Sequence, residues 1–337
     1  MDKEKYIGAI ESFPKRKILV LGDYCIDRIW NVSKILPNPE APVMRTVTYP
    51  SGITETLGAA GNVSRGLRAL QAQTYVLGVI GMDEGSRNLL DLFLKDGINT
   101  EGMFSQNGRV TPIYQRLVSG KDLPYPIQTM QRLDLENDNL VEENVLSEII
   151  GYLGRKIQKI DAIILADYQE GEAKGVVNEV LIRVLSQEAK EAGKILVGDS
   201  RERFHLLEGY TAITPNRKET DRTLESLNEN INQNSYDDAK KLVERLGLKY
   251  ALTKRDRDGL IISSSEESRT FPATTPENKV IEVCGAGDVV TEIFTLGLAS
   301  GLNCFESAEL ANIGAGIAVQ KSGVSVVSLE ELLKAIN

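Results

Sequence analysis

A glycine-rich turn near the C-terminal end of the chain has the composition of an anion-binding loop with a base beside it. Gly285-Ala286-Gly287-Asp288 leads into an apolar stretch with helical period, residues 289–298. The glycines allow a sharp turn that brings backbone N–H groups close to an anion, and the helix start adds unpaired donors and a positive dipole end. These residues suit phosphoryl transfer to a hydroxyl. The simpler alternative is an ordinary helix start capped by Asp288.

Two other clusters have side chains that suit a sugar. Gly22 and Asp23 follow the first predicted strand, and Asp27 comes shortly after them. Two carboxylates can accept hydrogen bonds from sugar hydroxyls, and they serve equally well to cap a loop. The segment from Gly58 to Asn62 opens a predicted helix with small residues and one amide, which allows a polyol to approach closely. Its alternative is helix–sheet packing with Asn62 as a cap.

Further polar residues come directly after predicted strands, namely Asp167-Tyr168, Asp199-Ser200-Arg201 and the segment Thr214 to Glu219. Ligands of open α/β sheets bind at the carboxyl ends of the strands. We therefore expect these residues near the glycine-rich turn, although the third segment also reads as a plain helix N-terminus.

Several enzyme classes are excluded or disfavoured by motifs that the sequence lacks. No G-x-x-x-x-G-K-[ST] pattern occurs, which excludes a P-loop mechanism, and no G-x-G-x-x-G follows the first strand, which disfavours a dinucleotide-dependent dehydrogenase. The only histidine, His205, is no basis for a His-based catalytic triad.

Alternating patterns of strand and helix predict an α/β fold with a central, mostly parallel sheet and helices on both faces. Strands are predicted at 17–21, 75–80, 162–166, 195–197, 250–253 and 260–263, and helices at 60–70, 85–95, 145–157, 176–192, 236–246, 288–299 and 305–321.

Two segments break this alternation. Val43–Tyr49 and Val110–Arg132 alternate like exposed antiparallel strands, and Pro, Gly and Asn punctuate them. We expect the two segments to pair in a small β lid, formed by roughly residues 32–56 and 109–133, beside a single domain that takes up residues 1–337.

Composition indicates a cytoplasmic enzyme. The 337 residues are 42% hydrophobic, which is enough for a large core, and the net charge of -9 argues against nucleic acid or an anionic membrane as the partner. Three cysteines without metal-site spacing read as reduced thiols. We find no signal peptide pattern and no apolar run of membrane-spanning length.

The order and spacing of these motifs resemble the ribokinase-type (PfkB) carbohydrate kinases over nearly the whole chain. Within that family the chain is most similar to the kinases that phosphorylate D-glycero-β-D-manno-heptose 7-phosphate at C1. The resemblance implies a ribokinase-like three-layer sandwich. It rests on Gly22-Asp23, Asp27 to Trp30, Pro39 to Val43, Gly58 to Val63, Asp167-Tyr168, Thr214 to Asn216 with Glu219, and Gly285 to Asp288.

The resemblance also implies roles for individual residues, with ATP and Mg²⁺ as cofactors, a sugar or sugar phosphate as substrate and a homodimer formed through the lid. Asp288 would be the general base, with Gly285, Ala286 and Gly287 forming the anion hole. The substrate would be held by Asp23, Asp27, Gly58 and Asn62. The nucleotide would be held by Asn216, Glu219, Thr253, Arg255 and Gly259, of which Asn216 and Glu219 would also position the metal.

Several positions depart from the family pattern. Glu282 and Cys284 replace an Asp and a Thr, Ala59 replaces a Gly, and Glu170 stands where the heptose kinases carry a Lys. Glu292 replaces a small residue and lies one helical turn after Asp288, so we expect repulsion that raises the pKa of Asp288 or distorts the nucleotide side of the helix. The sequence therefore leaves two hypotheses: an active sugar kinase, or a catalytically weak relative that binds sugar or nucleotide as a sensor or assembly partner.

Overall fold

A nine-stranded sheet forms the centre of the molecule in the computed structural model, which describes residues 2–119, 128–169, 171, 174–232, 235–324 and 326–336. Its strand order is β15-β14-β13-β12-β11-β10-β1-β6-β7, and all neighbours are parallel except β13–β14 and β14–β15. The strands are β1 (Lys17–Gly22), β6 (Gln73–Ile80), β7 (Asn99–Ser105), β10 (Ala162–Asp167), β11 (Ile195–Ser200), β12 (Ala212–Ile213), β13 (Tyr250–Lys254), β14 (Leu260–Ser263) and β15 (Ser268–Phe271).

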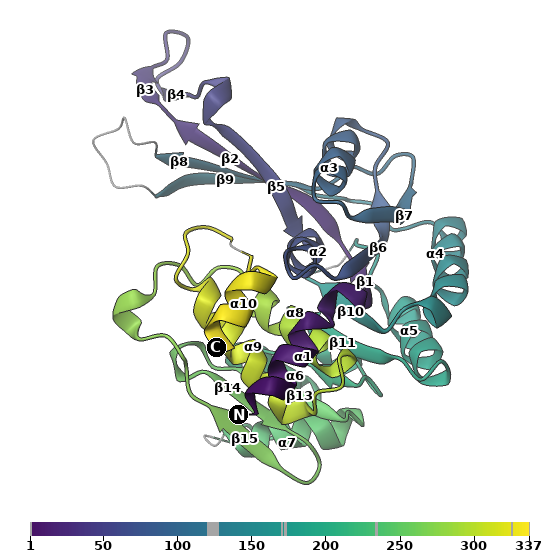
Figure 1. The fold of residues 1–337 in the computed structure, drawn as a ribbon. Coiled ribbons are helices and arrows are strands. Elements are labelled where there is room, and N and C mark those ends of the chain that lie inside the picture. Colours follow the sequence, from purple (N-terminus) through teal and green to yellow (C-terminus); the bar gives the residue numbers. More distant parts are fainter. Residues whose placement is uncertain are drawn as a thin grey trace.

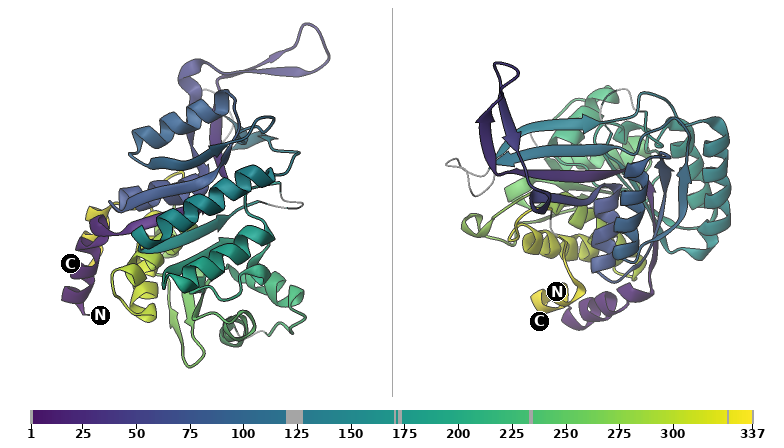
Figure 2. Two further views of the ribbon diagram at one scale, coloured as in Figure 1. Left: turned by 90° about the vertical axis from the view of Figure 1, so that its right-hand side faces the viewer. Right: turned by 90° about the horizontal axis from the view of Figure 1, so that it is seen from above.

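Helices cover both faces of this sheet and produce two separate cores (Figures 1 and 2). Ile18 and Val20 of β1 pack into one core, and Leu19 and Leu21 pack into the other, as the period of two in a strand requires. The first core is covered by α1 (Lys3–Glu11), α2 (Ala60–Ala69), α3 (Glu84–Lys95), α8 (Ala286–Ala299), α9 (Cys304–Ala318) and α10 (Leu329–Ile336). The second is covered by α4 (Glu143–Lys156), α5 (Glu179–Glu191), α6 (Arg217–Ser226) and α7 (Ser235–Leu246).

This architecture confirms the predicted α/β class with its central, mostly parallel sheet. Two helices are shorter than predicted. Helix α5 begins at Glu179 because Asn178 is its N-cap and accepts a hydrogen bond from the Leu181 N–H, and α9 ends at Ala318. None of the helices in the described part of the chain is both long and apolar enough to cross a membrane.

A second sheet projects from the body of the molecule (Figure 1). Its strand order is β5-β2-β8-β9, built from β2 (Tyr24–Val32), β5 (Ile53–Ala59), β8 (Ile113–Ser119) and β9 (Thr129–Leu135). A separate two-stranded ribbon joins β3 (Lys34–Pro37) to β4 (Met44–Val47).

The predicted pairing of Val43–Tyr49 with Val110–Arg132 is therefore wrong. The strand in the first segment, β4, pairs with β3, whereas β8 pairs with β2 and β9. The reason is that β2 continues the chain directly after β1 and occupies the position beside β8, which leaves the first segment to fold back as a local ribbon.

Candidate active site

A cavity of about 680 Å³ lies where the ends of the central strands, the start of α8 and the second sheet meet. Polar and charged side chains dominate its wall, as a site for a hydrophilic ligand requires. The wall includes Asp23, Asp27, Asn62, Tyr114, Arg116, Arg132, Asp134, Glu136, Tyr168, Asp199, Arg201, Asn216, Glu219, Lys254, Cys284, Gly285, Gly287 and Asp288.

The start of α8 contributes the glycine-rich turn to this wall. Gly285 is the N-cap, with a φ of 83° that an L side chain rarely adopts. Asp288 therefore lies in the first turn of the helix and is not its cap, contrary to the simpler alternative. A Cβ on Gly287 would lie 3.4 Å from Lys254 Nζ, so an ammonium group stands beside the anion-binding turn.

The Asp288 carboxylate is buried among groups that control its charge. Burial raises its pKa to about 6, and the negative charge of Asp199 adds to the effect. A hydrogen bond of 2.9 Å from the Tyr168 hydroxyl to Asp288 Oδ1 acts in the opposite direction, as does the charge of Lys254. A carboxylate with a pKa near the working pH is well suited to general-base catalysis.

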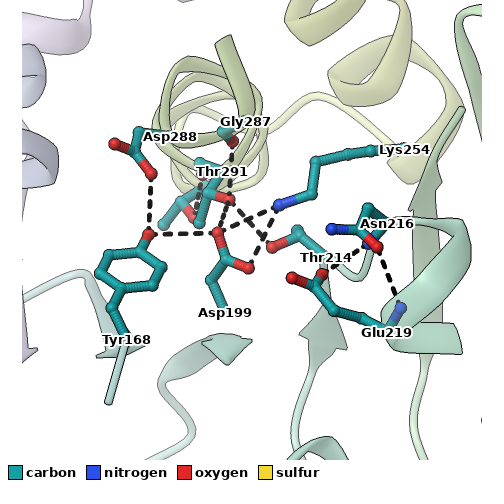
Figure 3. A network of polar contacts seen from close by, with 10 residues as sticks. Tyr168, Asp199, Thr214, Asn216, Glu219, Lys254, Gly287, Asp288 and Thr291 are labelled. Atoms are coloured by element: carbon teal, nitrogen blue, oxygen red, sulfur yellow. Dashed lines mark hydrogen bonds and ion pairs between the residues drawn. The ribbon is translucent and has the colours of Figure 1, made fainter. Parts of the chain in front are cut away.

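Asp199 is the centre of the polar network beside Asp288 (Figure 3). Both of its carboxylate oxygens lie 3.2 Å from Lys254 Nζ. Its Oδ2 also accepts hydrogen bonds from the Thr291 hydroxyl at 3.0 Å and the Tyr168 hydroxyl at 3.2 Å. Thr291 shares a further hydrogen bond of 2.9 Å with Thr214, which ties α8 to the end of β12.

The register of β10 and β11 explains why Tyr168 and Asp199 reach the cavity. Asp199 is paired with Ala166, so the next pair, Asp167 with Ser200, points to the other side of the sheet. The buried Asp167 accepts hydrogen bonds from the Ser200 hydroxyl at 2.7 Å and from the Arg203 guanidinium. Asp167 and Arg203 thus form an ion pair on the opposite side of the sheet, whereas Tyr168 and Asp199 line the cavity.

The start of α6 places Asn216 and Glu219 at another part of the wall. They form a capping box, in which Asn216 Oδ1 accepts from the Glu219 N–H at 2.9 Å and Glu219 Oε2 accepts from the Asn216 N–H at 2.7 Å. Burial raises the pKa of Glu219 to about 7, and Asp199 adds to the rise while Lys254 opposes it.

On the side of the second sheet, two buried acceptor atoms lack a hydrogen-bond partner within the described residues. Asp23 Oδ1 accepts from the Val176 N–H at 2.7 Å, but Asp23 Oδ2 has no partner, and neither has Asn62 Oδ1. Burial raises the pKa of Asp23 to about 6. Because buried polar atoms are normally satisfied, these two acceptors are suited to a ligand that carries hydrogen-bond donors.

The structure thus brings most of the predicted site residues to one cavity. Gly58 is not in the wall but supports it, because a Cβ there would lie 2.9 Å from the Asp27 carboxyl carbon. Three predicted nucleotide residues are also outside the wall: Thr253 is buried in β13, Arg255 pairs with Asp258 at 3.6 Å, and Gly259 turns with a φ of 82°.

The prediction omitted several residues that the cavity contains. Tyr168 and Asp199 were expected near the glycine-rich turn but had no assigned role, whereas Lys254 was not named, although it directly follows the predicted strand 250–253. Arg116 and Arg132 had no such signal. They face each other across β8 and β9 in the second sheet, and only the tertiary structure brings them to the site.

The expected repulsion between Glu292 and Asp288 has a different consequence from the one predicted. The carboxyl of Glu292 is buried against Gly66 of α2, and its Oε2 has no hydrogen-bond partner among the described residues. Burial and then the charge of Asp288 raise the pKa of Glu292 well above its usual value. This shift favours the neutral acid of Glu292, and the raised pKa of Asp288 comes from burial and Asp199 instead. Glu170 lies outside the described residues.

Comparison with known proteins agrees with this geometry. Residues 15–332 match the PfkB family of carbohydrate kinases. A bifunctional protein HldE from Desulfatibacillum aliphaticivorans is 35% identical over 327 residues, which cover 96% of this chain and 63% of that protein. A protein of the same name from Campylobacter jejuni (strain RM1221) is 32% identical over 326 residues, or 95% of this chain. The chain spans 63% and 65% of the length of these two curated relatives.

Solved structures show the same fold. Ribokinase from Arabidopsis thaliana, complexed with ribose and ATP, aligns with a TM-score of 0.70 at 18% identity, covering 95% of this chain and 98% of that one. Phosphofructokinase-2 from Escherichia coli, in complex with substrates and products, aligns with a TM-score of 0.70 at 15% identity and the same coverage. Fold and sequence together define a sugar kinase, and the chain belongs to the PfkB family of carbohydrate kinases.

Proposed function

We propose that this kinase transfers the γ-phosphoryl group of ATP to a hydroxyl of a sugar phosphate, with Asp288 as the general base. The observation that carries the proposal is the shared cavity. It contains a carboxylate in the first turn of α8, glycine amides beside it, and the unpartnered acceptors of Asp23 and Asn62 on the other side. The cytoplasm, which supplies ATP, is the compartment that this reaction requires.

In the proposed reaction, Asp288 removes the proton of the acceptor hydroxyl while the hydroxyl oxygen bonds to the γ-phosphorus and ADP leaves. Backbone N–H groups of Gly285 to Asp288 and the dipole of α8 stabilise the negative charge on the transferring group. The ammonium of Lys254, next to Gly287, adds a fixed positive charge at the same place. The second sheet would act as a lid that keeps water, a competing acceptor, away from the phosphoryl group.

The residues at the start of α6 fit a nucleotide-bound magnesium ion. Among the described residues, no group of three or more His, Cys, Asp or Glu side chains is arranged to hold a metal, so the ATP phosphates and water would supply most ligands. Glu219 uses one carboxylate oxygen in the capping box, which leaves the other for the ion or its water. The oxygen of Asn216 is engaged in the cap, so Asn216 would act by holding Glu219. Bound Mg²⁺ neutralises phosphate charge.

The arginines of the second sheet favour a substrate that is itself a phosphate ester. Arg116 and Arg132 lie in register on β8 and β9 and line the cavity. Burial raises the pKa of Asp27, and the positive charges of the two arginines act in the opposite direction. Guanidinium groups are well suited to phosphate oxygens. Together with the resemblance of residues 39–43 to the heptose kinases, this makes heptose 7-phosphate, phosphorylated at C1, the first substrate to test.

The test measures ADP release from wild type and Asp288→Asn over heptose 7-phosphate, hexose phosphates and unphosphorylated sugars. General-base assistance contributes about 10²–10⁴-fold, so Asp288→Asn should lose turnover by about that factor and retain ATP binding in calorimetry. Glu84→Gln, in the first turn of α3, is the matched control and should keep full activity. Equal turnover of wild type and Asp288→Asn on the best substrate would refute the mechanism and favour a sugar- or nucleotide-binding role.

A further inference from the structure

The hydroxyl of Tyr168 contacts the carboxylate of Asp288, and the proposed mechanism so far gives it no role. The distance from Tyr168 Oη to Asp288 Oδ1 is 2.9 Å, and the distance to Asp199 Oδ2 is 3.2 Å. A phenol has one proton, so Tyr168 can donate to only one of these carboxylates at a time.

The other contacts of Asp199 decide which carboxylate receives that proton. Asp199 already has Lys254 Nζ at both oxygens and the Thr291 hydroxyl at Oδ2. The contact of Tyr168 with Asp288 is also the shorter one. Tyr168 therefore donates to Asp288, and its contacts with both carboxylates can be followed in Figure 3.

The backbone and ring of Tyr168 are fixed independently of Asp288. The preceding residue, Asp167, is buried at the end of β10 and bound by Ser200 and Arg203, and its carbonyl oxygen accepts from the Arg201 N–H at 3.0 Å. The ring of Tyr168 packs against the core that α8 covers. A donor anchored in this way can orient a carboxylate at little entropic cost.

We propose that Tyr168 is the positioning residue of the base: its hydroxyl holds Oδ1 of Asp288, so that Oδ2 faces the acceptor hydroxyl and takes its proton. The inference rests on the proposed function, in which Asp288 is the base. No proton leaves Tyr168 in this step; the sugar proton moves to Oδ2 of Asp288 as the new O–P bond forms. Burial, followed by the charges of Asp199 and Asp288, raises the pKa of Tyr168 well above its usual value, so the tyrosine remains a donor.

The neighbours of Asp288 predict opposite effects for two substitutions on the pH dependence of turnover. The Tyr168 hydrogen bond and the charges of Lys254 and Arg201 lower the pKa of Asp288, whereas the charge of Asp199 raises it. Glu292, on the same helix, is not among the groups that shift the pKa of Asp288, and burial raises its own pKa. Removal of the hydroxyl should therefore move the acid limb of the pH–rate profile to higher pH, and removal of the Asp199 charge should move it to lower pH.

The experiment compares kcat, KM and pH–rate profiles of wild type, Tyr168→Phe and Asp199→Asn on the best sugar substrate. Tyr168→Phe should lower kcat about tenfold at neutral pH, a loss typical of one hydrogen bond to a charged group, and should raise the midpoint of the acid limb by up to about one pH unit. KM for ATP should be unchanged. Asp199→Asn should lower the midpoint.

Tyr210→Phe is the matched control. Tyr210 is also buried, and its hydroxyl has no hydrogen-bond partner among the described residues. It packs in the core on the opposite face of the sheet, so its loss should leave the profile unchanged. A general effect of removing a buried tyrosine hydroxyl would appear equally in this variant.

The outcomes separate this inference from the proposed function. An unchanged pH profile in Tyr168→Phe, with Asp288→Asn inactive, overturns the role of Tyr168 and leaves Asp288 as the base. Activity in Asp288→Asn overturns the proposed function itself. If Tyr168→Phe does not fold, as judged by thermal unfolding, protein carrying fluorinated tyrosines decides: the more acidic Tyr168 hydroxyl is a stronger donor and should move the acid limb to lower pH, and an acid limb that does not move overturns the inference.

Discussion

Two carboxyl groups one helical turn apart have opposite properties in this enzyme, and their surroundings explain the difference. The Asp288 side chain lines the cavity beside Lys254 and Tyr168, which stabilise its ionised form. Glu292 is buried against α2, and one of its oxygens has no hydrogen-bond partner in the described part of the chain. The first group is suited to act as a base near neutral pH, and the surroundings of the second favour its protonated form.

Glu292 should lower the stability of the protein at neutral pH. Its pKa is raised in the folded state by burial and Asp288, so the folded state binds a proton that the unfolded state releases above about pH 4.5. Unfolding is then favoured increasingly as the pH rises from the unfolded pKa to the folded one. Glu292→Gln removes this effect and should raise the Tm at pH 7.5 by about 2 °C or more.

The same substitution should change little at pH 4, where wild type is already protonated in both states. Thermal unfolding followed by circular dichroism at both pH values measures the difference. The turnover rate and the acid limb of the pH–rate profile should not change, since the raised pKa of Glu292 favours its neutral form when Asp288 acts. A Tm gain that is equal at both pH values would show that packing, rather than protonation, is responsible.

Among the secondary-structure elements, α8 begins with a turn whose backbone conformation favours glycine. Gly285 has a φ of 83°, and a Cβ there would lie 3.0 Å from Val324 Cγ1. Gly285→Ala should therefore cost about 1–2 kcal/mol of stability from backbone strain, and displacement of the turn should lower kcat more than tenfold. Differential scanning calorimetry and ADP release measure the two effects.

Gly301→Ala is the control for strain alone. Gly301 has a φ of 88° and open space around its missing Cβ, and it lies at the far end of α8. This variant should lose similar stability and retain its activity. Similar kcat values for the two variants would contradict a role of the glycine-rich turn in phosphoryl transfer.

At the scale of the whole molecule, the two faces of β9 differ in a way that predicts self-association. Arg132 and Asp134 line the cavity, whereas the alternate residues Leu133 and Leu135 have exposed fractions of 58% and 42%. β9 is also an edge strand of the second sheet. Exposed apolar residues on an open edge favour association with another sheet, and we propose a homodimer formed through this face.

Leu133→Glu should convert the dimer to a monomer at micromolar concentration, because the new charge would be buried in the interface. Light scattering coupled to size-exclusion chromatography measures the mass. Val180→Glu is the control, because Val180 is 55% exposed on α5, a helix that covers the central sheet. A wild-type protein that is monomeric at all accessible concentrations would contradict the proposal.

The sequence alone determined the α/β class and much of the site, because both depend on local patterns. The period of β1 and the polar residues after the strands are consequences of strand geometry, which places consecutive side chains on opposite faces and parallel strand ends at one edge. The turn from Gly285 to Asp288 could likewise be predicted from the sequence, because a glycine-rich turn before a helix presents backbone N–H groups to an anion.

Only the tertiary structure decided the environment of these residues. Arg116 and Arg132 reach the cavity because β8 pairs with β2 and with β9. The pairing of β8 with β2 joins distant segments, and no local pattern encodes it. The contact between Tyr168 and Asp288 joins residues 120 positions apart, and burial against α2 raises the pKa of Glu292. The charge of a carboxyl depends on desolvation and on neighbours within a few ångströms, and these are properties of the folded chain.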